Sequence, residues 1–224
     1  MVKATSTERS AVMTFSFKEL RYTLWFPVYM VMYLAMEKLF PIPIYWSHTP
    51  LDALIPFCEA FVIPYSLWYP LLIAVGVYLL CRDIPAYHRY MAFLAATFFL
   101  STLIWFLYPN GQALRPAVMP RDNLLTALVG LIYRADTCTN VFPSVHVVGS
   151  LGALFAVWDC PRLRIRHPKI CRGVTVLAVL ICLSTVFIKQ HAVADVICGV
   201  LLSLFVAVPV YGLSRVSSFS LKWA

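Results

Sequence analysis

The sequence predicts an all-α, polytopic membrane protein, built as a bundle of six transmembrane helices. Hydrophobic residues make up 61% of the 224 residues, and the mean hydropathy is +0.80. Charged residues make up only 12% of the chain, about half the usual share of a soluble domain. One core of this size cannot bury so many apolar side chains. The bilayer must therefore solvate many of them.

Six apolar stretches are long enough to be read as helical spans, since a helix needs about 20 residues to cross the hydrocarbon core. Between Glu59 and Arg82, for example, the chain contains no Asp, Glu, Lys or Arg. Pro64 and Pro70 predict a kink in that stretch. The six predicted spans are residues 22–39, 59–82, 90–108, 143–159, 173–188 and 192–211.

The predicted spans form one domain, residues 22–214. Residues 1–21 are expected to be a cytoplasmic N-terminal segment, and residues 215–224 a cytoplasmic tail. A short turn is predicted at residues 82–89. The longest polar connection, residues 109–143, contains Leu124–Tyr133, which predicts a short helix at the membrane interface.

The 18 Lys and Arg residues predict the orientation of the bundle. With both termini in the cytoplasm, 13 of them lie on the inner side and 5 on the outer side, the asymmetry that orients membrane proteins. We expect a plasma-membrane location. The net charge of +8 does not indicate a nucleic-acid partner, because the cations stand at the ends of apolar runs and not on one face. The outer five are Lys38, Arg115, Arg121, Arg134 and Lys189.

Two stretches carry titratable groups where lipid-compatible side chains would be expected. They are Asn140-Val-Phe-Pro-Ser-Val-His146 and Ser184-Thr-Val-Phe-Ile-Lys-Gln-His-Ala-Val-Ala-Asp195. Polar and ionisable groups are costly within or beside a bilayer, so they indicate function. The predicted topology places Arg115, His146 and His191 on the same outer face. The two stretches therefore predict one extracytoplasmic site.

The residue types in these stretches suit phosphoryl chemistry. His191 and Asp195 are spaced i, i+4, so on a helix they would share a face, and the carboxylate would orient the imidazole as a nucleophile. His146 suits a general acid or base near neutral pH. Arg115 can bind phosphate oxygens through two parallel hydrogen bonds, and Lys189 can add a point charge. The helix beginning near Ser144 offers free N–H groups to an anion.

Other interpretations of the polar residues stay open at this point. A single histidine near the end of a span is more often a packing or headgroup residue than a catalytic one, and we interpret His48, His88 and His167 in this way. Two histidines and one carboxylate can also bind a metal ion, but no further acidic or histidine partner is near them in sequence. Cys58 and Cys138 fall on one predicted face, and we expect both to remain free thiols.

Three motifs resemble those of a known family. Arg115-Pro116, Pro143-Ser144-Val145-His146 and Ser184…His191…Asp195 resemble the three signatures of the type 2 phosphatidic acid phosphatase/haloperoxidase superfamily. The resemblance implies six helices, an outward-facing site without metal or other cofactor, and a phosphohistidine mechanism. In that mechanism His191 attacks phosphorus, Asp195 orients it, and His146 protonates the leaving alcohol. Arg115, Ser144 and Lys189 would bind the phosphate.

Two positions depart from the family pattern. The lysine usual in the first signature is replaced by Tyr108, and the arginine usual after the serine of the third is replaced by Thr185. A phosphomonoester is nearly a dianion at neutral pH, whereas a phosphodiester carries one charge, so losing two cations favours a diester. These replacements resemble the sphingomyelin synthase and inositol-phosphorylceramide synthase branch.

The sequence therefore predicts a membrane enzyme whose partners are membrane lipids. Its first predicted activity is that of a lipid phosphate phosphatase, which is the commonest activity in the superfamily. The first alternative is transfer of a phosphodiester headgroup between lipids, supported by the two missing cations. The second alternative is a lipid-binding protein without catalysis. The sequence does not identify the lipid, the acceptor or the oligomeric state.

Overall fold

The computed structural model describes residues 17–212, and most of them are helical. The predicted tail and most of the predicted N-terminal segment lie outside the described residues. The elements follow in the order η1 (Phe17–Thr23), α1 (Trp25–Leu39), β1 (Tyr45–Trp46), η2 (Pro50–Leu54), η3 (Glu59–Phe61), α2 (Val62–Ser66), α3 (Trp68–Arg82), α4 (Ile84–Leu107), β2 (Asn110–Gly111), α5 (Leu124–Ala135), α6 (Val145–Asp159), α7 (Pro161–Arg166), α8 (Pro168–Phe187) and α9 (Val193–Tyr211).

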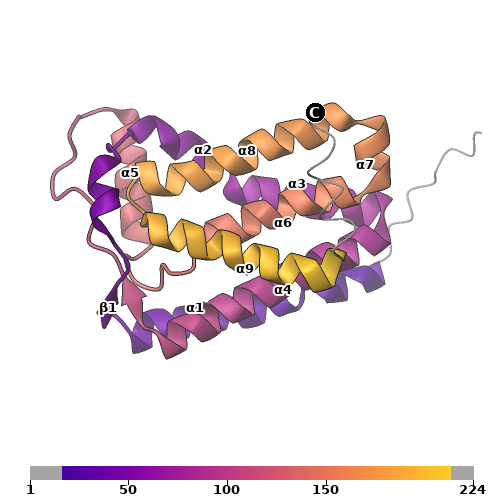
Figure 1. The fold of residues 1–224 in the computed structure, drawn as a ribbon, viewed down its shortest axis with the longest axis horizontal. Coiled ribbons are helices and arrows are strands. Elements are labelled where there is room, and N and C mark those ends of the chain that lie inside the picture. Colours follow the sequence, from indigo (N-terminus) through magenta and orange to yellow (C-terminus); the bar gives the residue numbers. More distant parts are fainter. Residues whose placement is uncertain (1–16, 213–224) are drawn as a thin grey trace, which may run out of the picture.

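The long helices run side by side along the long axis of the molecule (Figure 1). Helix α6 packs against α3, α4, α8 and α9, and most of its 15 residues are buried. Glycines allow this close packing. A Cβ added to Gly152 would lie 2.9 Å from ring atoms of Phe93, and one added to Gly199 of α9 would lie 2.9 Å from Val147 Cβ. Helix α6 is therefore the central helix of the bundle.

Four helical stretches among residues 17–212 are long and apolar enough to cross a membrane, so the chain is an integral membrane protein. They match the second, third, fifth and sixth predicted spans. Helices α1 and α6 have only 15 residues each, about 22 Å against a hydrocarbon core of about 30 Å. Six transmembrane helices are therefore not confirmed. The four stretches are Glu59–Arg82, Ile84–Leu107, Pro168–Phe187 and Val193–Tyr211.

Two predicted boundaries were wrong. Residues 82–89 are not a short turn, because α4 begins at Ile84. There the carboxylate of Asp83 accepts a hydrogen bond from the Ala86 N–H at 3.0 Å, and a proline occupies the first turn. The fifth span also begins earlier than residue 173, since Pro168 starts α8. The basic run before it forms the short helix α7.

The predicted kink in the second span is confirmed as a break between α2 and α3 at Leu67. Pro70 has no N–H to donate to the carbonyl of Ser66, so a regular helix cannot continue through this turn. The predicted short helix at Leu124–Tyr133 is also confirmed. It is α5, and it continues to Ala135.

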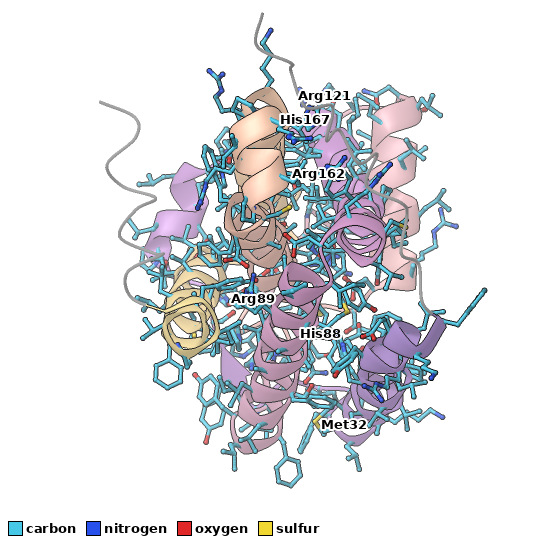
Figure 2. The ribbon with its side chains drawn as sticks, turned by 90° about the vertical axis from the view of Figure 1, so that its right-hand side faces the viewer. Met32, His88, Arg89, Arg121, Arg162 and His167 are labelled. Atoms are coloured by element: carbon cyan, nitrogen blue, oxygen red, sulfur yellow. The ribbon has the colours of Figure 1, made fainter. Side chains whose placement is uncertain are left out.

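The two ends of the bundle differ. One end carries α5, β1 and the starts of α6 and α9, whereas the opposite end carries α7 (Figure 1). Strand β1 pairs in parallel with β2, with Tyr45 opposite Asn110. Figure 2 looks onto the opposite end, where Arg89, Arg162 and His167 are labelled. The basic residues of α7 and of the start of α8 belong to this second end.

Candidate active site

Two histidines face each other at the end of the bundle that carries α5. His146 lies in the first turn of α6, and His191 lies just before α9. His191 Nε2 and His146 Nδ1 are 3.3 Å apart. Both residues are buried, with 7% of His146 and 5% of His191 exposed. The structure thus brings together two side chains that are 45 residues apart in sequence.

The second ring nitrogen of His191 lies between two acceptors. Its Nδ1 is 3.1 Å from the carbonyl oxygen of Val141 and 3.4 Å from Asp195 Oδ2. A carbonyl or carboxylate oxygen cannot donate, so Nδ1 carries the proton and Nε2 keeps its lone pair. Asp195 is fully buried, and its Oδ2 also accepts the N–H of Ala192 at 2.8 Å. His191 precedes the first residue of α9, so His191 and Asp195 do not share a helix face. Their side chains meet at the start of α9.

The turn between α8 and α9 sets the position of His191. The N–H groups of Gln190 and His191 both donate to the carbonyl of Thr185, at 2.9 and 3.0 Å. This tight turn requires a left-handed backbone at Lys189, where φ is 57°. Such a conformation is costly for a residue with a Cβ and is typical of functional sites.

The ring of His146 is held between two aromatic side chains. Its centroid lies 4.5 Å from that of Tyr65 and 4.3 Å from that of Trp68. Trp68 reaches this position because Gly149 leaves room for it: a Cβ added there would lie 2.8 Å from Trp68 Nε1. These contacts limit the orientations open to the imidazole.

Ser144 joins the starts of α6 and α9. Its backbone N–H donates to the carbonyl oxygen of Asp195 at 3.1 Å. Its hydroxyl is fully buried and has no hydrogen-bond partner within the described part of the chain. The first N–H groups of a helix such as α6 have no partner within the helix itself. An anion beside His146 would therefore find a hydroxyl and backbone amides to bind.

The structure does not bring Arg115 to the histidine pair. Its guanidinium donates to the carbonyl oxygens of Tyr133, Asp136 and Thr137, at 3.1, 3.0 and 2.5 Å. It also lies 4.5 Å above the ring of Tyr133. These carbonyls end α5, where a helix carries partial negative charge. In this conformation Arg115 caps α5.

Lys189 is likewise directed away from the histidines. Its Nζ donates to the carbonyl oxygens of Asp52 and Ile55, at 2.8 and 2.5 Å. Burial lowers the pKa of this ammonium group, and the nearby Asp52 partly opposes that effect. Lys189 therefore ties the turn before α9 to η2.

A cavity of about 400 Å³ lies beside the histidine pair. Among the described residues, Asp136 is the only acidic one that lines the cavity, and no Lys or Arg lines it. Asp136 accepts hydrogen bonds from the Tyr33 hydroxyl at 2.9 Å and from the Gln190 amide at 3.1 Å. Eight aromatic residues in the described part of the chain line the cavity, namely Phe26, Tyr29, Tyr33, Tyr65, Trp68, Tyr69, Phe98 and Trp105.

Sequence reasoning missed three residues around His191. They are Val141, whose carbonyl contacts the imidazole, Asn110, which binds the Val141 segment, and Gln112. Gln112 is fully buried, and its amide donates to the carbonyls of Lys189 and Gln190 at 3.0 and 3.2 Å. The sequence offers one signal for Asn110 and Gln112, because both are uncharged amides directly after a long apolar run.

The side chains at the two positions that depart from the family pattern do not contact the histidine rings. Tyr108 stacks on Tyr45 with ring centroids 4.3 Å apart, and Thr185 Oγ1 donates to the carbonyl of Cys182 at 2.8 Å. Cys58 and Cys138 are both free thiols. Within residues 17–212, no group of three or more His, Cys, Asp or Glu side chains is arranged to hold a metal ion.

Comparison with known proteins identifies the family of the region that contains this site. Residues 112–218 match the family model of the PAP2 superfamily. The matched region contains Arg115, Ser144, His146, Lys189, His191 and Asp195. No curated protein and no solved structure matches the chain.

Proposed function

The chain belongs to the PAP2 superfamily through residues 112–218, and we propose that it cleaves a phosphate ester of a membrane lipid through a phosphohistidine on His191. The observation that carries this proposal is the geometry of the histidine pair. Nε2 of His191 keeps its lone pair because Nδ1 lies between two acceptors, and this lone pair faces His146 across 3.3 Å. The proposed mechanism has a nucleophile, an orienting group and an acid within one buried site.

The first step makes one bond and breaks one. The phosphoryl group enters between the two imidazoles, which move apart to admit it. His191 Nε2 then bonds to phosphorus while the P–O bond to the leaving alcohol breaks, and protonated His146 gives its proton to the departing oxygen. The Ser144 hydroxyl and the amides of the first turn of α6 stabilise the charge on the equatorial oxygens.

The second step reverses these roles. Neutral His146 removes a proton from an acceptor hydroxyl, which attacks phosphorus as the bond to His191 breaks. The acceptor is water in a phosphatase and a lipid alcohol in a transferase. His146 is protonated again and His191 is free again in either case, so these two residues do not by themselves choose the acceptor.

The charges around the cavity favour a phosphodiester substrate, and with it the transferase. Arg115 and Lys189 point to backbone carbonyls, and the cavity wall contains Asp136 but neither of these cations. The two negative charges of a monoester would have no nearby cation among residues 17–212 to balance them. A zwitterionic diester lipid carries one negative charge and a cationic end, and aromatic faces together with one carboxylate can bind that cationic end. Phe26 and Leu34 line the cavity from α1 and are also 40% and 54% exposed, which supports a substrate that enters from the bilayer.

We propose that the α7 end faces the cytoplasm, because basic residues are concentrated there. The site would then face outward. A membrane-impermeant thiol label on intact cells, read at single introduced cysteines in α5 and α7, tests this orientation. Labelling of α7 and protection of α5 from outside intact cells would reverse it.

Purified protein in mixed vesicles tests the activity. One vesicle set contains phosphatidic acid, and a second contains phosphatidylcholine with diacylglycerol or ceramide as acceptor. We expect acid-labile phosphohistidine on wild type and none on His191→Ala, with His167→Ala at the opposite end as the matched control. Free phosphate from the first set would identify a phosphatase, and a new phospholipid in the second would identify a transferase. No phosphohistidine on either set would contradict the proposal.

A further inference from the structure

The acceptor nearest to His191 Nδ1 is a backbone carbonyl and not the carboxylate of Asp195. The distance to Val141 O is 3.1 Å, against 3.4 Å to Asp195 Oδ2. Asp195 Oδ2 also accepts the N–H of Ala192 at 2.8 Å, so its interaction with the imidazole is shared. The orientation of His191 therefore depends on where the Val141 carbonyl is held.

Asn110 holds the segment that contains Val141 through both the oxygen and the nitrogen of its side-chain amide. Its Oδ1 accepts the N–H groups of Val141 at 2.9 Å and Phe142 at 2.7 Å. Its Nδ2 donates to the carbonyls of Phe142 at 3.0 Å and Tyr108 at 2.7 Å. Only 1% of Asn110 is exposed. A carboxylate could accept but not donate these hydrogen bonds, and an alkyl group could do neither, so neither replaces the amide.

Asn140, the residue before Val141, is held by further hydrogen bonds of its backbone and of its side chain. The Asn140 N–H donates to the backbone carbonyl of Asn110 at 2.7 Å. The Asn140 side chain donates to Glu37 Oε1 at 2.6 Å, which ties it to the last turns of α1. Its φ is 56°, in the left-handed region that asparagine tolerates better than most residues. The Val141 carbonyl is therefore set by tertiary contacts on both sides.

We propose that Asn110 is a positioning residue for the nucleophile. It acts through the Val141 carbonyl, which keeps the proton of His191 on Nδ1 and directs the Nε2 lone pair toward the substrate. When Nε2 bonds to phosphorus, the imidazole gains positive charge, and the Val141 carbonyl shares the stabilisation of Nδ1–H with Asp195. This inference rests on the proposed role of His191 as nucleophile.

Two variants of Asn110 test the proposal. Asn110→Ala removes all four hydrogen bonds, whereas Asn110→Asp keeps the acceptor for Val141 and Phe142 but loses both donated bonds. We expect kcat to fall by about 100-fold in Asn110→Ala, the scale of a small misplacement of reacting groups, with KM nearly unchanged. We expect a smaller loss in Asn110→Asp. Asn123→Ala is the matched control, because Asn123 caps α5 and does not contact the Val141 segment.

A second readout separates positioning from general destabilisation. Nitrogen-15 NMR of histidine-labelled protein reports which ring nitrogen of His191 carries the proton. We expect Nδ1–H in wild type and in Asn123→Ala, and a mixture of tautomers in the Asn110 variants. An unchanged His191 tautomer, or a kcat loss that only follows the folded fraction, would overturn the proposal. If Asn110→Ala does not fold, Asn110→Asp carries the same test.

The tautomer measurement does not require turnover, so the two proposals fail in different ways. Absence of phosphohistidine in wild type contradicts the proposed function, whatever the tautomer. Phosphohistidine in wild type together with full kcat in both Asn110 variants contradicts the positioning role alone.

Discussion

Two buried carboxylates, at opposite ends of the bundle, have different kinds of partner. Asp159 ends α6, and its Oδ2 accepts a hydrogen bond from Arg89 Nε at 2.5 Å. Asp195 lies in the first turn of α9, and its Oδ2 is 3.4 Å from Nδ1 of His191. An arginine is always charged, so the first pair is permanently compensated. The second pair depends on an imidazole that can gain and lose a proton.

Buried polar atoms without a hydrogen-bond partner in the described chain occur at both ends, and at the α7 end they include the hydroxyls of Tyr87 and Tyr211. Near the histidine pair, Asp195 Oδ1, Ser144 Oγ, Asn140 Oδ1 and Gln190 Oε1 are buried without a hydrogen-bond partner in the described chain. Buried polar groups usually have hydrogen-bond partners, so several unpartnered groups in one place indicate a ligand-binding site. The two ends therefore differ in how the buried carboxylate is held: an arginine binds it at the α7 end, whereas Asp195 lies among several unpartnered polar atoms around the histidine pair. The following experiments test that difference, beginning with the largest effect.

Removing the nucleophile should have the largest effect on activity. We expect His191→Ala to lower kcat by about 10⁴-fold or more, because no other group can form the phosphorylated intermediate. Near-normal thermal unfolding in detergent would show that the fold survives. Substantial remaining activity would mean that the buried pair at this end is structural, as the Arg89–Asp159 pair is.

Removing the orienting charge should have the next largest effect. We expect Asp195→Asn to lower kcat by about 10²- to 10³-fold, less than the about 10⁴-fold seen when a catalytic histidine loses its only orienting acid. The Val141 carbonyl would still hold Nδ1–H. Rates of phosphohistidine formation measured by rapid quench check this, and a loss equal to that of His191→Ala would show that the carbonyl contributes nothing.

Separating α6 from α9 should have a smaller effect. A Cβ at Gly199 would lie 2.9 Å from Val147 Cβ and 3.1 Å from the Ser144 carbonyl, so Gly199→Ala must shift α9 relative to α6. We expect kcat to fall about 10-fold. Gly173→Ala in α8 is the matched control, since nothing lies within 4 Å of its added Cβ. Equal activity of the two variants would contradict this prediction.

Breaking the ion pair at the α7 end should change stability and leave the chemistry intact. We expect Arg89→Met to lower the free energy of unfolding by about 2 kcal/mol, because Asp159 stays buried and loses its ion pair with the Arg89 guanidinium. Activity per folded molecule should equal that of wild type. A fall in kcat after correction for the folded fraction would show that the two ends are coupled.

Chelation should have the smallest effect. The described residues include no cluster suited to a metal ion, and the proposed steps use only side chains and backbone amides. We expect EDTA to leave kcat unchanged within error. Loss of activity that a divalent ion restores would favour the interpretation of His146, His191 and Asp195 as metal ligands.

The amino-acid sequence alone determined the membrane class, four of the long helices, α5 and the break before Pro70, because hydropathy and proline act within a few residues. It also indicated which histidines converge, since helix order fixes the face on which each span begins. Only the tertiary structure decided that Arg115 and Lys189 bind backbone carbonyls and that Asn110 holds the Val141 carbonyl against His191. These contacts join segments far apart in the chain, and backbone carbonyls carry no sequence signal. The direction of a long cationic side chain depends on such partners, which no local pattern records.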